Sequence, residues 1–246
     1  PVDEVGTIEA AEMTKLLGML YRDVNIALVN ELAAFCEMSG VDFDRVRSAA
    51  NSDGEASLLI PGIGVGGHCT PVYPYFLTRE SRRMGVTQRI SEAAREINDF
   101  QPARQLDRLA NAWRPLKGQK VHILGLGFRP DVKVDTLSPA FALRDHLLQS
   151  QSRVTIEDPL YTDEELREKG FVPGKVEDAA IAVLNTAHKA FQQPDFSAWR
   201  QAGVEVVLDG RNLWNQLEIE KAGLFYFGVG RSSEPELRRA LQHLGS

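Results

Sequence analysis

Cys69 is the side chain of this sequence best suited to act as a nucleophile. It ends a glycine-rich stretch, GIGVGGHC, in which Gly62, Gly64, Gly66 and Gly67 allow backbone amides to approach a ligand closely. A thiolate beside such N–H groups, or beside a cation, is reactive near neutral pH. A small buried cysteine that caps a glycine-rich turn would produce the same pattern, so the motif alone leaves a structural and a catalytic interpretation open.

Lys15 is a second candidate, because it interrupts the apolar face of an N-terminal helical pattern. A lysine at such a position normally lies at the solvated edge of the apolar face. It gains a chemical role if the Cys69 loop folds back over this helix, and Arg22, seven residues on, would then share its face. His68 adjoins Cys69, but neighbouring side chains usually point apart. The other cysteine, Cys36, lies in the middle of the helical pattern and is interpreted as a packing residue.

A Gly-Leu-Gly turn at residues 125–127 matches only part of the dinucleotide-binding fingerprint. The fingerprint requires a third glycine at position 130, which is Pro130. The turn can still receive a nucleotide, because ligands of open α/β sheets gather at the carboxyl ends of the strands. Arg129 and Arg211 each follow a predicted strand. They could bind phosphate there through paired, charge-assisted hydrogen bonds, or be ordinary surface arginines.

Helical periodicity dominates the first hundred residues. Apolar residues recur at three- and four-residue steps over residues 7–38, and Gly40 follows them as a plausible C-cap. A shorter helix is predicted over residues 43–51, with Asp42 as its N-cap.

The Cys69 loop is itself part of a longer irregular segment. Residues 58–74 are rich in glycine and proline and show no helical period, so they are predicted to form a loop or turn system. Helix resumes near Tyr75 and again over residues 86–113. Pro102 lies inside the second pattern and predicts a kink or a short break there.

The second part of the chain has the pattern of a β/α protein. Its apolar runs are typical of buried parallel strands, and helical stretches such as residues 141–149 lie between them. The predicted strands are residues 121–128, 153–158, 179–185 and 204–210. The second strand ends in Glu157 and Asp158, where a ribose-binding acid would lie.

Strands that alternate with helices indicate βαβ units and a parallel sheet. We therefore predict an α/β protein in which a helical central domain is joined by a long helix to a Rossmann-like parallel-sheet domain. The boundary is expected between residues 100 and 118. We divide the chain into residues 1–105, which carry the Cys69 loop, and residues 106–246.

Composition excludes several classes of protein. The chain has 246 residues, and its 28 basic and 34 acidic side chains give a net charge of −6, which argues against nucleic acid as a partner. Two cysteines cannot build a disulfide framework, so a reducing cytoplasm is expected. No apolar run approaches the ~18 residues of a membrane span, so no membrane partner is predicted. No His, Cys and acidic cluster has metal-ligand spacing, and no metal site is predicted.

Five segments together give the sequence a specific resemblance. They are AAEMTKLLGMLYRDVNIALVNELAAFCE (10–37), PGIGVGGHCTPVYPYFL (61–77), AREINDFQP (94–102), ILGLGFRPDV (123–132) and LDGRNLW (208–214). In this order they resemble the nucleotide-sugar dehydrogenases, NAD-dependent enzymes that oxidise the C6 hydroxyl of a UDP-sugar, or occasionally a GDP-sugar, to a uronic acid. The GVGGHC motif is closer to the branch that acts on UDP-N-acetylmannosamine or UDP-N-acetylglucosamine than to UDP-glucose dehydrogenases.

The resemblance also implies a domain plan. In that family an N-terminal Rossmann domain binds NAD, a helical middle domain forms the dimer, and a C-terminal α/β domain holds the nucleotide of the sugar. This chain resembles only the last two, in agreement with the incomplete fingerprint and with Pro1 in place of methionine. We therefore expect part of a larger enzyme, a homodimer that binds a UDP-sugar, in which these residues alone do not transfer hydride.

Individual residues acquire roles through the same resemblance. One NAD would take a hydride from C6 to give an aldehyde, Cys69 would attack it, and a second NAD would oxidise the thiohemiacetal to a thioester that water hydrolyses. Lys15 matches the family lysine that stabilises the developing oxyanion or orders water beside the thiol. The residues expected to bind the nucleotide sugar are Arg22, Gly64, Gly66, Gly67, Phe128, Arg129 and Arg211. Arg129 replaces a family lysine.

The sequence departs from the family pattern at four places. Met19 stands where the family usually has asparagine, Tyr73 where it has aspartate and Thr136 where some members have arginine, and residues 51–59 lack the usual basic residues. Tyr73 could still act through its hydroxyl. These changes support an alternative hypothesis, in which the chain is a nucleotide-sugar-binding and dimerisation module with degraded catalysis.

Overall fold

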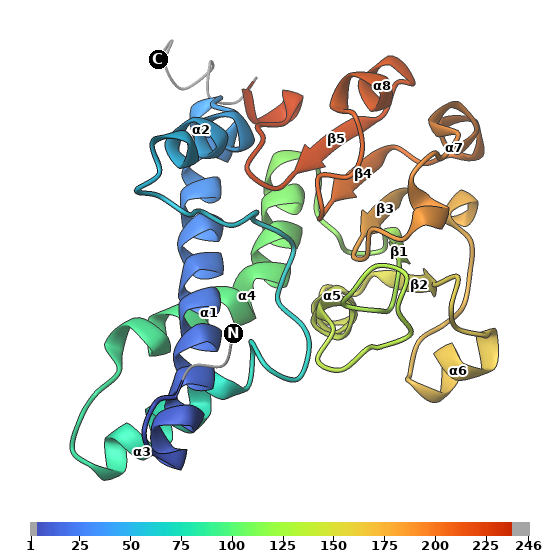
Figure 1. Cartoon of the computed structure of the whole chain (residues 1–246). Coiled ribbons are helices and arrows are strands. Elements are labelled where there is room, and N and C mark those ends of the chain that lie inside the picture. The colour runs from blue at the N-terminus through green and yellow to red at the C-terminus, as the bar shows by residue number, and fades with distance from the viewer. Residues whose placement is uncertain (1–3, 238–246) are drawn as a thin grey trace.

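A long helix and a parallel sheet organise the computed structural model of the chain, which describes residues 4–237. The helix, α1 (Ile8–Ser39), forms the axis of a helical region (Figure 1). Its ends are set locally: the hydroxyl of Thr7 accepts from the amide of Ala10 at the N-cap, and Gly40 adopts a φ of 77° at the C-cap. The predicted helix and its C-cap are confirmed.

Three further helices complete the helical region. They are α2 (Phe43–Ala50), α3 (Tyr73–Arg83) and α4 (Arg89–Ala112). Asp42 caps α2 as predicted, since its carboxylate accepts from the amides of Asp44 and Arg45. Helix α4 runs without interruption through Pro102, so of the two outcomes predicted there a break is wrong. The buried Pro102 ring packs against the loop at Gly64, and this burial favours the continuous helix.

A five-stranded sheet forms the second region. Its strands are β1 (Lys120–Leu124), β2 (Arg153–Glu157), β3 (Ile181–Leu184), β4 (Val206–Asp209) and β5 (Phe225–Gly228). Their order is β2-β1-β3-β4-β5, and every neighbouring pair is parallel. The four predicted strands are confirmed, each shorter than expected, and β5 was not predicted. The parallel sheet confirms the predicted α/β class.

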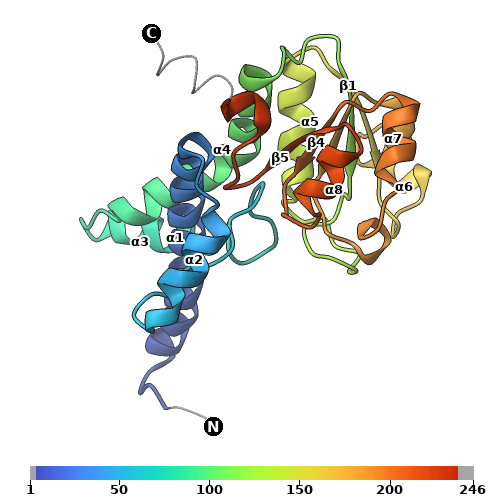
Figure 2. The same ribbon diagram turned by 90° about the horizontal axis from the view of Figure 1, so that it is seen from above.

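Helices cover both faces of this sheet. The remaining helices are α5 (Pro139–Gln149), α6 (Asp163–Glu168), α7 (Phe196–Ala202) and α8 (Gln216–Lys221), with short 3-10 turns at Asn51–Asp53, Val176–Asp178 and Lys189–Phe191. Helix α5 packs on one face, while α7 and α8 pack on the other (Figure 2). In the central strand β3 and in its neighbour β4, alternate residues enter the two cores, so these strands are almost entirely apolar.

Helix α4 belongs to both regions. Its first half packs along α1, where Arg95 pairs with the buried Asp23, and its second half places Leu106 and Leu109 in the core of the sheet. Residue 105, at which the sequence was divided, therefore lies inside one helix. The division into two domains stays a prediction.

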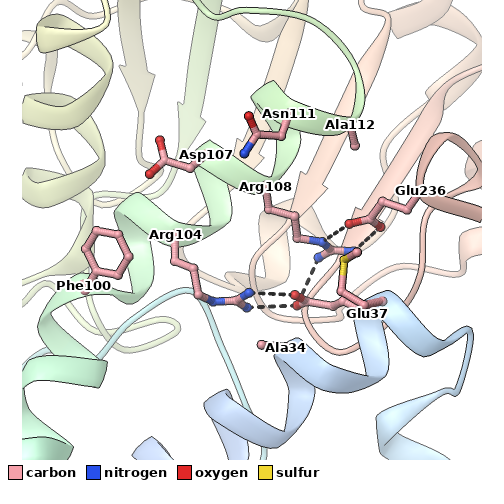
Figure 3. Close-up of a pocket in the computed structure, with 10 residues that line it drawn as sticks. Ala34, Glu37, Phe100, Arg104, Asp107, Arg108, Asn111, Ala112 and Glu236 are labelled. Atoms are coloured by element: carbon pink, nitrogen blue, oxygen red, sulfur yellow. Dashed lines mark hydrogen bonds and ion pairs between the residues drawn. The ribbon is translucent and has the colours of Figure 1, made fainter. Parts of the chain in front are cut away.

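Buried ion pairs connect the helical region to the sheet region (Figure 3). Glu37 of α1 accepts hydrogen bonds from Arg104, Gln105 and the amide of Gly230, and lies 3.1 Å from Arg108. Burial would raise the pKa of Glu37, but Arg108 and Arg104 outweigh it and hold that pKa below its usual value. These bonds join α1 to α4 and to the segment that follows β5. We call this group of four charged residues, Glu37, Arg104, Arg108 and Glu236, the joint.

Arg108 is the most heavily bonded member of the joint. Its guanidinium donates to both carboxylate oxygens of Glu236, to the side chain of Gln105 and to the carbonyl groups of Gly228 and Arg231. A cavity of about 480 Å³ opens beside these residues, with apolar side chains such as those of Phe100 and Met38 at its walls. Because its charged residues already bond to one another, the joint connects the helices to the sheet and leaves little polar capacity for a ligand.

Candidate active site

The loop that carries Cys69 is held from three sides at its beginning. The amide of Gly62 donates to the side chain of Asn30 on α1 at 3.0 Å, and its carbonyl accepts from Gln101 of α4 at 2.9 Å. The next amide, of Ile63, donates to the carbonyl of Gly210 beyond β4 at 2.9 Å. The loop therefore crosses from the helical region to the carboxyl edge of the sheet, where ligands of this fold class bind.

The glycines of this loop permit close packing of the chain on itself. A Cβ at Gly66 would lie 2.5 Å from the Cβ of Phe128, and one at Gly64 would lie 2.9 Å from Pro139. Gly67, with a φ of +104°, lies against the ring of Phe128, and its amide donates to the carbonyl of Thr136 at 2.8 Å. The sequence predicted that these glycines admit a ligand. The structure places Phe128 there, so that the predicted aromatic residue and the Cys69 loop meet.

Cys69 lies in the turn that leads into helix α3. Its carbonyl accepts from the amides of Val72 and Tyr73, at 3.2 and 2.9 Å, which closes one helical turn. The side chain is partly exposed and its thiol is free. Cys69 therefore lies just before the N-terminal end of α3, the end at which a helix favours negative charge.

Tyr73 and Lys15 lie near the turn that carries Cys69. An interaction with the Cys69 side chain raises the pKa of Tyr73 above its usual value. The Lys15 ammonium on α1 lies 5.8 Å from the centre of the Tyr73 ring. The loop has thus folded back over α1, which was the condition for a chemical role of Lys15. Met19, one turn further along α1, is buried.

The neighbouring His68 is directed toward the sheet side of the loop. It is exposed, and its Nε2 lies 3.2 Å from the hydroxyl of Thr136. This contact and the bond from Gly67 anchor the loop to the segment between β1 and α5. Thr136, one of the departures from the family pattern, is therefore part of the support beneath Cys69.

The Gly-Leu-Gly turn after β1 does not fit the phosphates of NAD. The amides of Leu126 and Gly127 both donate to the carboxylate of Asp158, at 2.7 and 3.1 Å. Burial would raise the pKa of Asp158, but its bond with His188 and those with backbone amides hold it low. The donors that would hold a pyrophosphate are already used, and the proposed ribose-binding acid is the group that uses them.

His188 bonds to the segment after this turn and to Asp158. It is fully buried, and its Nδ1 accepts from the amide of Asp131 at 2.9 Å while its Nε2 lies 3.1 Å from Asp158. Since Nδ1 is an acceptor, we assign the proton to Nε2, which donates to Asp158. His188 and Asp158 were not predicted as partners, and the only signal for them was an acidic residue at the end of a strand.

Arg211 lies where the sheet meets the beginning of the glycine loop. Its Nε donates to the carbonyl of Asn185 at 2.6 Å, and a terminal nitrogen lies 3.4 Å from the carbonyl of Gly64. Desolvation lowers the pKa of Arg211 to about 10, against the opposing effect of Asp209. At pH 7 the guanidinium therefore keeps its charge and can face an anionic ligand.

Two predicted binding residues have no contact with this cluster. Arg22 on α1 and Arg129 after Phe128 are exposed, and neither forms a hydrogen bond or ion pair with another of residues 4–237. The structure thus gathers Cys69, Lys15 and Phe128 around the loop and places Arg211 at its start. Within that same range, no group of three His, Cys, Asp or Glu side chains could hold a metal ion. None of the helices there has the length and apolar character of a bilayer span.

Comparison with protein families gives two matches on this chain. Residues 9–100 match the UDP-glucose/GDP-mannose dehydrogenase family, central domain, and residues 122–216 match the UDP binding domain of the same family. The first match contains the Cys69 loop and the second contains Phe128, Arg129 and Arg211.

Individual relatives agree with these matches. An NDP-N-acetyl-D-galactosaminuronic acid dehydrogenase of Ralstonia nicotianae is 32% identical over 85% of this chain and 49% of its own length. A UDP-N-acetyl-D-mannosamine dehydrogenase of Methanocaldococcus jannaschii is 30% identical over 90% of this chain and 52% of its own. The crystal structure of an NDP-N-acetyl-D-galactosaminuronic acid dehydrogenase from Methanosarcina mazei superposes with a TM-score of 0.76 at 28% identity, over 91% of this chain and 51% of that one. The chain spans about half the length of these relatives.

Proposed function

Because the chain belongs to the UDP-glucose/GDP-mannose dehydrogenase family, we propose that it forms the thiol-bearing and nucleotide-binding parts of an NAD-dependent nucleotide-sugar 6-dehydrogenase. The proposed reaction oxidises the C6 hydroxyl of a UDP-sugar to a uronic acid. A UDP-N-acetylhexosamine is the proposed substrate, since relatives named for N-acetylated sugars are 32% and 30% identical to this chain over the aligned residues. The observation that carries the proposal is the cluster of Cys69 and Lys15 on one loop-and-helix surface.

In this reaction Cys69 would form and break the covalent bond. Its sulfur adds to the C6 aldehyde, a C–S bond forms, and the electron pair of the carbonyl π bond moves to the oxygen, which takes up a proton. Loss of a hydride from C6 to the oxidant and of the hydroxyl proton to water then leaves a thioester, and water hydrolyses it to the carboxylate and the free thiol. The exposed ammonium of Lys15 would stabilise the oxygen while it is negatively charged.

NAD would accept the hydride in both oxidations. The turn at residues 125–127 does not fit its pyrophosphate, because Asp158 occupies the amides of that turn. We therefore propose that hydride transfer requires an NAD-binding domain in addition to residues 1–246. The role of these residues is to hold the sugar nucleotide and the thiol.

The nucleotide sugar would bind between the glycine loop and the carboxyl edge of the sheet. Arg211 carries a positive charge at the start of the loop, and Phe128 offers an aromatic surface beside it. Arg22 and Arg129 are exposed cations without partners among residues 4–237, so their charges are available to a diphosphate or a sugar carboxylate.

The chain itself permits a direct test of the thiol. Cys69 and Cys36 are alkylated with iodoacetamide at pH 7, and each rate is followed by peptide mass spectrometry with and without UDP-N-acetylmannosamine. Cys36 is the internal reference, because it is buried and burial raises its pKa. We expect fast labelling of Cys69 and protection by the UDP-sugar, and equally slow labelling of both thiols would contradict the proposal.

The complete reaction is tested in a protein that joins these residues to an NAD-binding domain. Two NADH per sugar consumed are expected for a four-electron oxidation, and Cys69→Ser is expected to stop the reaction after the first oxidation. Full conversion to the uronic acid by that variant would exclude the covalent route. The assay uses UDP-N-acetylmannosamine, UDP-N-acetylglucosamine and UDP-glucose in parallel, so that it also identifies the substrate.

The second candidate function is a binding and dimerisation module without catalysis. Met19, Tyr73 and Thr136 favour it, because they replace polar or charged residues of the family pattern. UDP-sugar binding without NADH formation for all three sugars, in the protein that includes an NAD-binding domain, would support this alternative.

A homodimer is part of both proposals. Large apolar side chains of α1 face solvent, and Ile8 and Phe35 among them are 77% and 71% exposed. The side of α1 that packs within the chain instead buries polar residues such as Asp23 and Asn30. A helix with its apolar side outward is expected to bury it against a second copy. Light scattering at micromolar concentration tests this, and a monomer would exclude it.

A further inference from the structure

A small cavity lies at the carboxyl edge of the sheet, beside the start of the glycine loop. Its volume is about 130 Å³, and Arg211 and Arg231 both line it. Arg211 follows strand β4, and Arg231 follows the neighbouring strand β5. Ile60 and Pro61 form another wall, so the cavity adjoins the place proposed for the nucleotide sugar. Two guanidinium groups at one small cavity suit a negatively charged ligand.

The fold uses only part of the hydrogen-bonding capacity of Arg231. Its Nε is buried and has no hydrogen-bond partner among residues 4–237, and a terminal nitrogen donates to the hydroxyl of Tyr226 at the long distance of 3.5 Å. A carboxylate oxygen of Asp42 lies 3.9 Å from Nε, beyond hydrogen-bond distance, and the other oxygen caps α2. The side chain remains 21% exposed, so its charge is accessible to a ligand.

The acidic residues near the two arginines have other partners. Asp209 is fully buried, and its carboxylate accepts from the backbone amides of Arg211 and Trp214 at 3.1 and 2.9 Å. Asp44, which lines the cavity, pairs with Arg47 at 2.8 Å. No carboxylate within residues 4–237 therefore forms a close, paired contact with either guanidinium at this cavity.

We propose that Arg231 binds a phosphate of the nucleotide in this cavity, together with Arg211. This inference rests on the proposed function, in which the chain binds a UDP-sugar. Pockets that hold a whole drug-sized ligand have volumes of about 300–1,000 Å³, so a cavity of about 130 Å³ suits one compact group such as a phosphate. Arg231 lies beyond residues 122–216, which match the UDP binding domain.

Three variants separate a phosphate contact from a general loss of charge. Arg231→Gln removes the guanidinium. Arg231→Lys keeps the positive charge beside Asp42 but lacks the planar pair of donors, and it is the variant to use where glutamine destabilises the fold. Arg167→Gln is the control, because it removes the same charge from an exposed side chain of α6 that pairs with Asp163 and Glu164.

The experiment measures the dissociation constants of UDP and of uridine by NMR titration at pH 7. Loss of a charge-assisted hydrogen bond is expected to weaken UDP binding about 10- to 100-fold in Arg231→Gln, with a smaller loss in Arg231→Lys. Uridine has no phosphate, so its affinity is expected to stay unchanged in both variants, which also shows that they are folded. Arg167→Gln should match the unsubstituted chain with both ligands.

A fourth variant tests whether Arg231 serves only to pair with Asp42. Asp42→Asn retains a good N-cap for α2 and removes the negative charge that lies 3.9 Å from Arg231. UDP affinity should stay the same or rise, because Arg231 is then less neutralised. A loss of UDP affinity equal to that of Arg231→Gln would show that the ion pair shapes the site, and would overturn the phosphate contact.

The outcomes separate this inference from the function on which it rests. Absence of UDP binding by the unsubstituted chain contradicts the proposed nucleotide-binding role itself. Equal UDP affinity of the unsubstituted chain and Arg231→Gln preserves that role and overturns the role of Arg231. An equal loss of UDP and uridine affinity in Arg231→Gln would show that this arginine supports the nucleoside or the fold and not a phosphate, and would also overturn it.

Discussion

The joint and the Cys69 site use charged side chains in opposite ways. In the joint, Glu37 and Arg108 are almost fully buried and bond to each other and to further partners. At the Cys69 site, Lys15 is exposed and contacts only the ring of Tyr73 among the described residues. A buried charge is tolerated when its partners satisfy it, whereas a binding residue must keep capacity for a ligand. The difference indicates which region holds the fold and which one is free to do chemistry.

The same contrast applies to the two cysteines. Cys36 lies in α1 next to Glu37, and its burial raises the pKa of its thiol. Cys69 lies just before the N-terminal end of α3 and is partly exposed. One chain therefore contains a packed thiol and an accessible one, so that each serves as the reference for the other.

Glu37→Gln is expected to have the largest effect on stability. It removes the negative charge that two arginines share and leaves Arg104 without a carboxylate partner. Since Arg108 keeps Glu236, the loss should lie at the lower end of the range for a broken buried pair, about 3 kcal/mol in the free energy of unfolding. Urea unfolding measures it.

The control for this change is Glu80→Gln, which removes an exposed partner of Arg83 on α3 and should leave stability nearly unchanged. In the folded Glu37→Gln variant, Cys69 should be alkylated at the unsubstituted rate. Equal stability of the two variants would remove the distinction between the joint and the surface.

Lowering the pH should remove part of the stabilisation that Glu37 provides. The folded-state pKa of Glu37 lies below its ordinary value of 4.5, so its contribution to stability is present above that pH and is lost as the pH falls through the folded value. The unfolding free energy of the unsubstituted chain should therefore fall more steeply below pH 4.5 than that of Glu37→Gln. Parallel pH profiles of the two proteins would show that Glu37 is not held ionised by the arginines.

Gly66→Ala should affect the Cys69 site more than the joint. The added methyl group would lie 2.5 Å from the Cβ of Phe128 and 3.0 Å from the carbonyl of Leu137, so the loop must move. A loss of about 1–3 kcal/mol is expected, together with slower alkylation of Cys69. Gly18→Ala on α1 is the control, because nothing lies within 4 Å of its Cβ, and a gain of about 0.5–1 kcal/mol in helix stability is expected.

Local signals explain which parts of the fold could be predicted. Helix α1 and its C-cap were predicted, because periodicity and Gly40 act over a few residues. Strand β5 was missed, since its four residues Phe225–Gly228 lie beyond the last recognised run and end in glycine. The continuity of α4 through Pro102 depends on packing against Gly64, a contact that no local pattern contains.

At the site, too, local patterns did not reveal contacts between residues far apart in the chain. Cys69 and Lys15 were singled out by residue type, and the resemblance placed them together, but neither gave the approach of the Lys15 ammonium to the ring of Tyr73. Asp158 ends the strand at which a ribose-binding acid could lie, but its partners are amides of a turn about thirty residues earlier in the chain. The joint brings Arg108 to Glu236 across 128 residues, and only the folded chain shows that pairing.

Lys15→Gln should have the smallest effect on stability. It therefore tests most sharply whether the Cys69 site, unlike the joint, uses its charge for chemistry and not for the fold. The side chain is exposed, its contact with the Tyr73 ring is 5.8 Å, and the change in unfolding free energy should stay within about 0.5 kcal/mol. Alkylation of Cys69 at pH 7 should nevertheless slow, and more so at low salt, because screening weakens the attraction between the ammonium and the thiolate. Lys117→Gln, an exposed lysine before β1, should change neither quantity. A clear loss of stability in Lys15→Gln, with unchanged labelling, would place Lys15 with the joint as a residue of the fold.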